Sequence, residues 1–172
     1  MKTKLLLVFL LFCKSTLSYS QKHFDLTVHQ DTKFIFVGDK RGNNVGTVDI
    51  LLKIEVPVIK FPKSYITVFP SYEYANLNGG TFKRYSVGAG YIFKGVYFKN
   101  INIGLFSDFG FITRNSKSGS SFGFNTEISY KLTRRVSLSY VHQITERSDL
   151  KFLYNDDSYI KPSSLMGFKV HF

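Results

Sequence analysis

The last ten residues of the chain read SSLMGFKVHF, from Ser163 to Phe172. In an extended segment, one face carries the apolar side chains of Met166, Phe168, Val170 and Phe172. The other face carries Leu165, Gly167, Lys169 and His171. Successive side chains of a β-strand point to opposite sides, so this period of two predicts a strand with one apolar face.

The same alternation recurs upstream and predicts an all-β protein. Six further segments show it, at residues 48–58, 66–74, 85–93, 101–111, 122–130 and 136–141. A less regular segment between Phe24 and Val37 brings the predicted number of strands to eight. No linker divides these segments, so the sequence predicts one domain.

Composition excludes several other classes of protein. The 172 residues are 44% hydrophobic and 17% aromatic, which is too much apolar surface for a disordered chain. No apolar run reaches the ~18 residues that a transmembrane helix needs. A domain built from strands remains.

The first twenty residues have the composition of a secretory signal peptide. Two lysines precede an apolar core at residues 5–12 that is too short to span a bilayer, and two serines supply small side chains where cleavage is expected. The sequence therefore predicts a signal peptide at residues 1–20, cleaved before Gln21, and an exported domain at residues 21–172. Cleavage removes Cys13, the single cysteine, so disulfides contribute nothing to the exported domain.

Amphipathic strands suit two opposite kinds of barrel. A soluble ligand-binding barrel of the lipocalin type turns its apolar face inward, whereas a membrane barrel turns that face toward lipid. Aromatic side chains are frequent on the apolar face and would overfill the interior of eight strands. The opposite face combines glycines with charges of both signs: Gly88, Gly90, Gly104, Gly110, Gly123, Gly167, Asp49, Lys53, Glu55, Glu73, Asp108, Glu127 and Lys169. Such side chains fit a narrow polar lumen, so the pattern favours lipid on the outside.

An exported chain of this length with eight amphipathic strands resembles the small outer-membrane β-barrels of the OmpX and OmpA transmembrane-domain type. The alternation that ends at Phe172 is similar to the C-terminal assembly signal of that family. The resemblance extends from about Phe24 to Phe172 and implies an eight-stranded antiparallel up-and-down transmembrane β-barrel. It also implies a Gram-negative outer membrane, both termini in the periplasm, and recognition of Phe172 by the barrel assembly machinery.

The connections between predicted strands alternate in length. Longer polar links are expected at residues 38–46, 76–83, 113–120 and 145–162. Tighter links are expected at residues 60–63, 94–100 and 132–135. The long links then lie at one end of an up-and-down barrel and the short ones at the other.

The charged residues of the predicted lumen suggest either a channel or a plug. The interior of an eight-stranded barrel is just wide enough for side chains to fill it. We therefore expect a structural, hydrogen-bonded plug made from Glu55, Glu73, Glu127, Lys53, Lys131 and Lys169.

One arrangement of residues invites an enzymatic interpretation. Membrane-embedded enzymes of lipid A acyl chemistry are of similar size and use a histidine with a serine or an aspartate. His142 with Ser139 or Asp149 would imitate that group. Serines and aspartates are common at strand ends, so the simpler interpretation is a histidine at the barrel rim. The sequence thus predicts no catalytic residues.

No cofactor or metal site is predicted either. His23 and His29 are too sparse for a metal-ligand motif. The neighbouring carboxylates of Asp156 and Asp157 are expected to be solvated in a loop.

Basic residues suggest partners for the long links. They are Lys40, Arg41, Lys83, Arg84, Arg114, Lys117, Arg147, Lys151 and Lys161. We expect them to be solvated or to contact outer-membrane lipid and lipopolysaccharide. Nucleic acid is not expected, because basic residues also occur at the opposite end. Aromatic residues of the link 145–162, Phe152, Tyr154 and Tyr159, either bind a surface ligand or cover the rim.

The function predicted from the sequence is non-enzymatic: a structural or surface-interaction role, in envelope integrity or adhesion, carried by the long links. Two alternatives stay open at this point. One is a membrane-embedded lipid-modifying enzyme, and the other is a soluble exported ligand-binding barrel.

Overall fold

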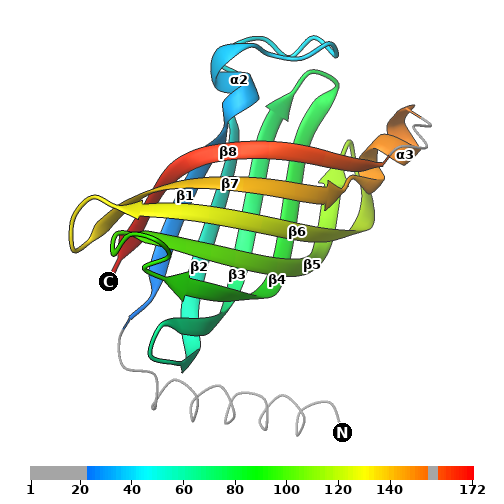
Figure 1. Cartoon of the computed structure of the whole chain (residues 1–172). Coiled ribbons are helices and arrows are strands. Elements are labelled where there is room, and N and C mark those ends of the chain that lie inside the picture. Colours follow the sequence, from blue (N-terminus) through cyan, green and yellow to red (C-terminus); the bar gives the residue numbers. More distant parts are fainter. Residues whose placement is uncertain (1–22, 155–158) are drawn as a thin grey trace, which may run out of the picture.

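A computed structural model describes residues 23–154 and 159–172, which form a closed antiparallel barrel of eight strands (Figure 1). The strands are β1 (Asp25–Asp31), β2 (Asp49–Lys60), β3 (Ser64–Leu77), β4 (Gly80–Lys94), β5 (Ile101–Arg114), β6 (Lys117–Lys131), β7 (Val136–Glu146) and β8 (Ile160–His171). Each strand pairs with the next in sequence, and β8 returns to pair with β1. The predicted fold class is therefore confirmed.

The first strand is shorter than the sequence predicts. It ends at Asp31, and the rest of the segment expected to be extended forms the short helix α2 (Thr32–Phe36). The cause is local, because the Asp31 carboxylate accepts a hydrogen bond from the Lys33 backbone nitrogen at 2.7 Å and caps the helix. A second short helix, α3 (Ser148–Tyr154), lies between β7 and β8.

Two of the four links predicted to be long are tight turns. Strands β3 and β4 continue to a turn at Asn78-Gly79, and strands β5 and β6 continue to a turn at Asn115-Ser116. Asn115 and Ser116 have φ angles of 50° and 62°, as a type I′ hairpin turn requires. The polar residues that suggested long links therefore belong to the ladders. The remaining links carry α2 and α3 at one end of the barrel, here called the helix end; β1 begins and β8 ends at the other, the terminal end (Figure 1).

The strands turn their apolar faces outward and their polar faces into the lumen, as the interpretation with lipid on the outside requires. In β6, Phe124 and Ile128 are 43% and 53% exposed on the outer surface, whereas Glu127 is 3% exposed in the lumen. In β8, Phe168 is exposed and Lys169 is buried. The alternative of a soluble ligand-binding barrel with an apolar interior is therefore wrong for this chain.

Within residues 23–154 and 159–172, no helix is both long and apolar enough to cross a membrane.

Aromatic rings and glycines together fill the part of the lumen toward the terminal end. The rings of Phe69 and Phe106 meet edge to face, 5.5 Å apart, in a cluster with Tyr65 and Ile92. An ideal Cβ built on Gly104 would lie 2.5 Å from Cε2 of Phe106. The glycine therefore provides the space that the ring occupies, and the ring in turn blocks the lumen.

Candidate functional site: a sealed lumen below a charged cavity

Four buried charges form a layer across the lumen. Nζ of Lys53 lies 2.7 Å from Glu55 and 2.9 Å from Glu127. Nζ of Lys169 lies 3.1 Å from Glu55 and also pairs with Glu127. All four side chains are buried, and the two positive and two negative charges balance. Such a layer is stable only when complete, because each charge depends on its partners for the interactions that water would otherwise supply.

The predicted plug is confirmed for these four residues and differs for two others. Glu73 is also buried in the lumen, but it accepts a hydrogen bond from Nε2 of Gln143 at 3.1 Å and does not contact the lysines. Lys131 is wrongly assigned to the lumen. It is the last residue of β6 and is exposed, because the barrel ends there.

A second charged layer lies toward the helix end. Arg84 pairs with Asp108, and its Nε donates to Oγ of Ser121 at 2.9 Å. Nδ2 of Asn125 donates to Asp108 at 2.8 Å. The prediction that Arg84 is solvated or contacts lipid is wrong, because its side chain is 1% exposed. The alternation along β4 could have predicted that Arg84 points into the lumen, because it shares a strand face with Ser86 and Gly88.

The space between the two layers is small. A void of about 10 Å³ there is lined by Lys53, Phe69, Arg84 and Asp108, among others. This is about enough for one water molecule. The packed side chains therefore close the lumen at this level.

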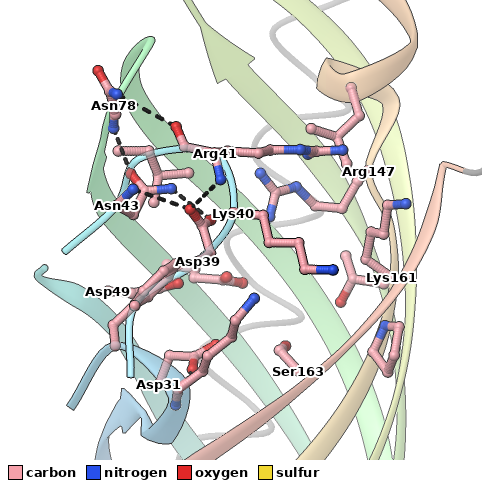
Figure 2. Close-up of a pocket in the computed structure, with 18 of the residues that line it drawn as sticks. Asp31, Asp39, Lys40, Arg41, Asn43, Asp49, Asn78, Arg147, Lys161 and Ser163 are labelled. Carbon is pink, nitrogen blue, oxygen red and sulfur yellow. Dashed lines mark hydrogen bonds between the residues drawn. The ribbon is translucent and has the colours of Figure 1, made fainter. Parts of the chain in front are cut away.

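Above the second layer the barrel opens into a larger cavity at the helix end. The helix-end cavity has a volume of about 650 Å³ and is drawn in Figure 2. Its charged and amide-bearing lining residues are Asp31, Lys33, Asp39, Lys40, Arg41, Asn43, Asp49, Glu73, Asn78, Arg114, Gln143, Arg147 and Lys161. Strands β1, β2, β3, β5, β7 and β8, the β3–β4 turn and both helix-bearing links supply these and the other lining residues. The cavity thus unites residues that are remote in sequence.

Asp149 anchors helix α3 beside this cavity. Its carboxylate accepts hydrogen bonds from Arg147 at 2.8 and 2.9 Å and from Nη1 of Arg114 at 3.2 Å. Burial alone would raise the pKa of the Asp149 carboxyl, but the hydrogen bonds and charges of the two arginines outweigh burial and lower that pKa. The same carboxylate raises the pKa of Arg147 against the effect of burial. Arg114 and Arg147, expected among the solvated cations, therefore hold the link to the barrel wall.

The anchor predicts a local response to acid. Because the pKa of Asp149 is lower in the folded protein than its ordinary value of 3.8, the anchor stabilises the link above that pH and is lost only as the pH falls through the lowered value.

We expect Asp149→Asn to speed amide hydrogen exchange in α3 at neutral pH, with little change in the β-strand amides. Unchanged exchange in α3 would contradict the anchoring role. Lys151→Gln on the same helix is the matched control.

The histidine group proposed for lipid chemistry does not assemble. Ser139 points into the lumen, where its Oγ lies 2.6 Å from Nε2 of His29. His142 is exposed on the outer face, with Nδ1 3.2 Å from Oγ of Ser164. Asp149 is engaged with the arginines. The structure thus places His142, Ser139 and Asp149 in three different environments, and the serine that contacts His142 is Ser164.

A different histidine trio, not predicted from the sequence, lies near the terminal end. Nδ1 of His171 lies 2.7 Å from Asp25, and its Nε2 lies 2.8 Å from Oγ of Ser137. This is the order of contacts in a Ser-His-Asp triad. Ser137 is fully buried, so its hydroxyl does not face a space that a substrate could enter. Asp25 and His171 are register partners across the β1–β8 seam, and we assign the trio a structural role in closing the barrel.

The aromatic residues of the last link divide between described and undescribed positions. Phe152 is half-buried, and Nζ of Lys117 in β6 lies 5.9 Å from its ring centroid. Phe152 therefore covers the rim. Asp156 and Asp157 lie outside the described residues. Within the described part of the chain, no cluster of three or more His, Cys, Asp or Glu side chains is suited to a metal ion.

The fold is similar to solved outer-membrane proteins. The outer membrane protein Ail of Yersinia pestis, determined in a phospholipid bilayer nanodisc, aligns with a TM-score of 0.55 at 14% sequence identity, over 88% of this chain and 100% of Ail. Neisserial surface protein A aligns with a TM-score of 0.50 at 13% identity, over 87% of this chain and 96% of that protein. No protein-family model and no curated protein matches the sequence. The chain thus has the fold of the small eight-stranded outer-membrane β-barrels.

Proposed function

We propose that this protein is an integral outer-membrane β-barrel whose helix end faces the cell exterior and acts in surface interaction or envelope integrity. The observation that carries the proposal is the orientation of the strand faces. Apolar side chains such as Phe124, Ile128 and Phe168 point outward, while the charged layers are sealed inside. A bilayer is the solvent that favours this arrangement, because it requires an apolar exterior and internal pairing of polar groups.

The proposal includes export and assembly. A signal peptide at residues 1–20 delivers the chain, and cleavage before Gln21 leaves residues 21–172. Phe172 is 54% exposed, and its ring stacks on Phe24 at 4.7 Å between centroids. An outward aromatic residue directly after β8 supports recognition by the barrel assembly machinery.

A non-enzymatic role is part of the proposal. The lumen is filled by side chains, and the serine of the buried Asp25–His171–Ser137 trio is inaccessible. The helix end carries the cavity and many cations, including Lys33, Lys40 and Arg41. Anionic lipopolysaccharide or acidic glycans at the cell surface are therefore the partners whose charge is complementary.

Charge placed in the outer belt tests the membrane assignment. Phe124 is the middle residue of β6, so Phe124→Arg is expected to destabilise the barrel in lipid by about 2–4 kcal/mol. The matched control is Val45→Arg, since Val45 is exposed in the β1–β2 link. Reversible denaturant unfolding in phospholipid vesicles, followed by circular dichroism, measures both changes.

The wild-type protein should also remain in the membrane fraction until detergent is added and migrate faster on gels when unheated. Release from cells without detergent would refute the proposed location. Equal effects of Phe124→Arg and Val45→Arg would refute the proposed lipid contact of the belt.

A further inference from the structure

The three links at the terminal end carry only positive charge. They connect β2 to β3, β4 to β5 and β6 to β7, and with the strand residues beside them they cover residues 60–63, 94–100 and 131–135 (Figure 1). These segments contain no aspartate or glutamate. Their basic residues, here called the rim cations, are all exposed: Lys60, Lys63, Lys94, Lys99, Lys131, Arg134 and Arg135.

Backbone hydrogen bonds join the three links into one arc. The backbone nitrogen of Lys94 donates to the carbonyl oxygen of Lys63 at 2.8 Å. The backbone nitrogen of Lys131 donates to the carbonyl oxygen of Asn100, also at 2.8 Å. The rim cations therefore follow one another along the terminal end from β2 to β7 and do not form separate groups.

No acidic side chain neutralises this arc. Among the residues that the structure describes, none of the rim cations forms an ion pair. Asp25, at the start of β1, is buried and pairs with His171. The helix end differs, because carboxylates and cations line its cavity together. Neighbouring charges of one sign repel one another in the isolated barrel, so the rim indicates an anionic partner.

Exposed apolar side chains lie between these cations. They belong to the same three links and are Phe61, Tyr97, Phe98 and Leu132. Tyr97 and Phe98 are 96% and 68% exposed. Tyr97 has a φ angle of 61°, which glycine and asparagine adopt more readily than an aromatic residue, so the geometry of the link does not account for the tyrosine. Aromatic rings beside long cationic side chains are typical of a membrane–water interface.

We propose that the rim binds anionic phospholipid headgroups in the bilayer leaflet at the terminal end. The lipid phosphates contact the rim cations, and the aromatic rings lie at the level of the headgroups. The inference rests on the proposed function, because it requires the barrel to span a bilayer, and the proposed orientation makes this the periplasmic leaflet. It extends that function by assigning the rim a class of lipid, a phospholipid with a net negative charge.

Other partners match the rim less well. A soluble anionic polymer of the cell wall would contact the cations but leave Phe98 and Leu132 in water. A zwitterionic phospholipid would cover these apolar side chains but bring as much positive as negative charge to the cations. An anionic phospholipid matches both the charge and the apolar surface.

Electron spin resonance of spin-labelled lipids tests this proposal. The full exported chain is reconstituted in phosphatidylcholine vesicles that contain spin-labelled phosphatidylglycerol or spin-labelled phosphatidylcholine, and the motionally restricted fraction measures the lipid at the protein surface. A phosphatidylglycerol headgroup beside a rim cation is expected to associate about fivefold more tightly than phosphatidylcholine. Because only one leaflet contacts the rim, the average preference over both leaflets is expected to be about threefold at low ionic strength.

Two quadruple variants with the same change in net charge separate the rim from charge in general. The rim variant combines Lys60→Gln, Lys63→Gln, Lys99→Gln and Arg134→Gln. The matched control replaces four exposed cations toward the helix end and combines Lys40→Gln, Lys83→Gln, Lys117→Gln and Lys151→Gln. We expect the preference for phosphatidylglycerol to fall below about twofold in the rim variant and to stay at about threefold in the control.

A measurement on the wild-type protein needs no substitution. The rim cations are exposed, so salt screens them. At about 1 M salt, where the Debye length is ~3 Å, the preference for phosphatidylglycerol is expected to approach one. A preference that persists at high salt would contradict the role of the rim charges and overturn the proposal.

Three further outcomes overturn the proposal. One is equal association of the two lipids with a protein that shows the folded gel mobility, which would leave the membrane assignment intact. A second is an equal loss of preference in both quadruple variants, because the attraction would then reflect net charge. The third is sedimentation with purified cell-wall sacculi that only the rim variant loses, together with equal association of the two lipids, which would assign the rim to the wall. Failure of the membrane assignment would appear separately, as solubility without detergent.

Discussion

Replacing Lys169 with methionine is expected to lower the free energy of unfolding of the barrel by about 3–5 kcal/mol. The substitution keeps most of the side-chain volume but removes a buried charge that contacts Glu55 and Glu127. The two carboxylates would then share Lys53 alone, and one negative charge would stay uncompensated in the lumen. Denaturant unfolding in detergent micelles, followed by far-ultraviolet circular dichroism, measures the change, and the absence of tryptophan makes fluorescence less suitable.

A second substitution separates charge from packing. Adding Glu127→Gln to Lys169→Met restores charge balance, so the double variant is expected to be more stable than Lys169→Met alone. Lys131→Met is the matched control, since Lys131 is exposed at the end of β6, and its effect should stay within about 0.5 kcal/mol. If Lys169→Met matched Lys131→Met in stability, the charged layer would have no structural role.

Truncation of Phe106 to alanine has the second large expected effect, a loss of about 3–5 kcal/mol of unfolding free energy. Phe106 is 2% exposed, and its ring packs against Phe69. The centroid of the ring lies 3.8 Å from Nζ of Lys53. Removing it leaves a cavity in the packed aromatic cluster of the lumen. The wild-type protein is expected to show no stable large conductance in planar bilayers. Phe106→Ala is the variant in which we expect ion conductance to appear.

The glycine that faces this ring provides a control with a defined sign. Gly104→Ala places a methyl group against Phe106 and is expected to cost about 1–3 kcal/mol in the wild-type background. In a Phe106→Leu background the smaller side chain leaves room for the methyl group, so the same substitution should lower the unfolding free energy by less. Equal costs in both backgrounds would show that Gly104 does not accommodate the ring.

Local patterns in the sequence predicted most of the barrel. The period of two identified seven strands, and a less regular segment gave the eighth. The aromatic residues on one face, with glycines and charges on the other, indicated the side that meets lipid. These properties are encoded by neighbouring residues, because the orientation of a side chain on a strand depends only on its parity. The same reasoning placed Lys53, Glu55, Glu127 and Lys169 correctly in the lumen.

The errors occurred where strands end. Asn78 and Asn115 are as typical of long polar loops as of tight turns, and only the pairing of β3 with β4 and of β5 with β6 distinguishes the two. Lys131 follows the alternation, but it is the last residue of β6 and is exposed where the barrel ends. The Asp31 cap likewise ends β1 well before Val37, where the predicted segment ends.

The sequence by itself therefore determined the strands, their apolar faces and the plugged polar interior, since each follows from interactions between near neighbours and solvent. Tertiary structure alone decided which inward residues meet. Lys53 and Glu127 are 74 positions apart, and Asp25 and His171 are 146 positions apart. Their contacts, and the cavity formed by Asp49, Gln143 and Thr145, depend on the stagger with which the sheet closes on itself. That stagger is a property of all eight strands together, so the sequence of a single strand does not predict it.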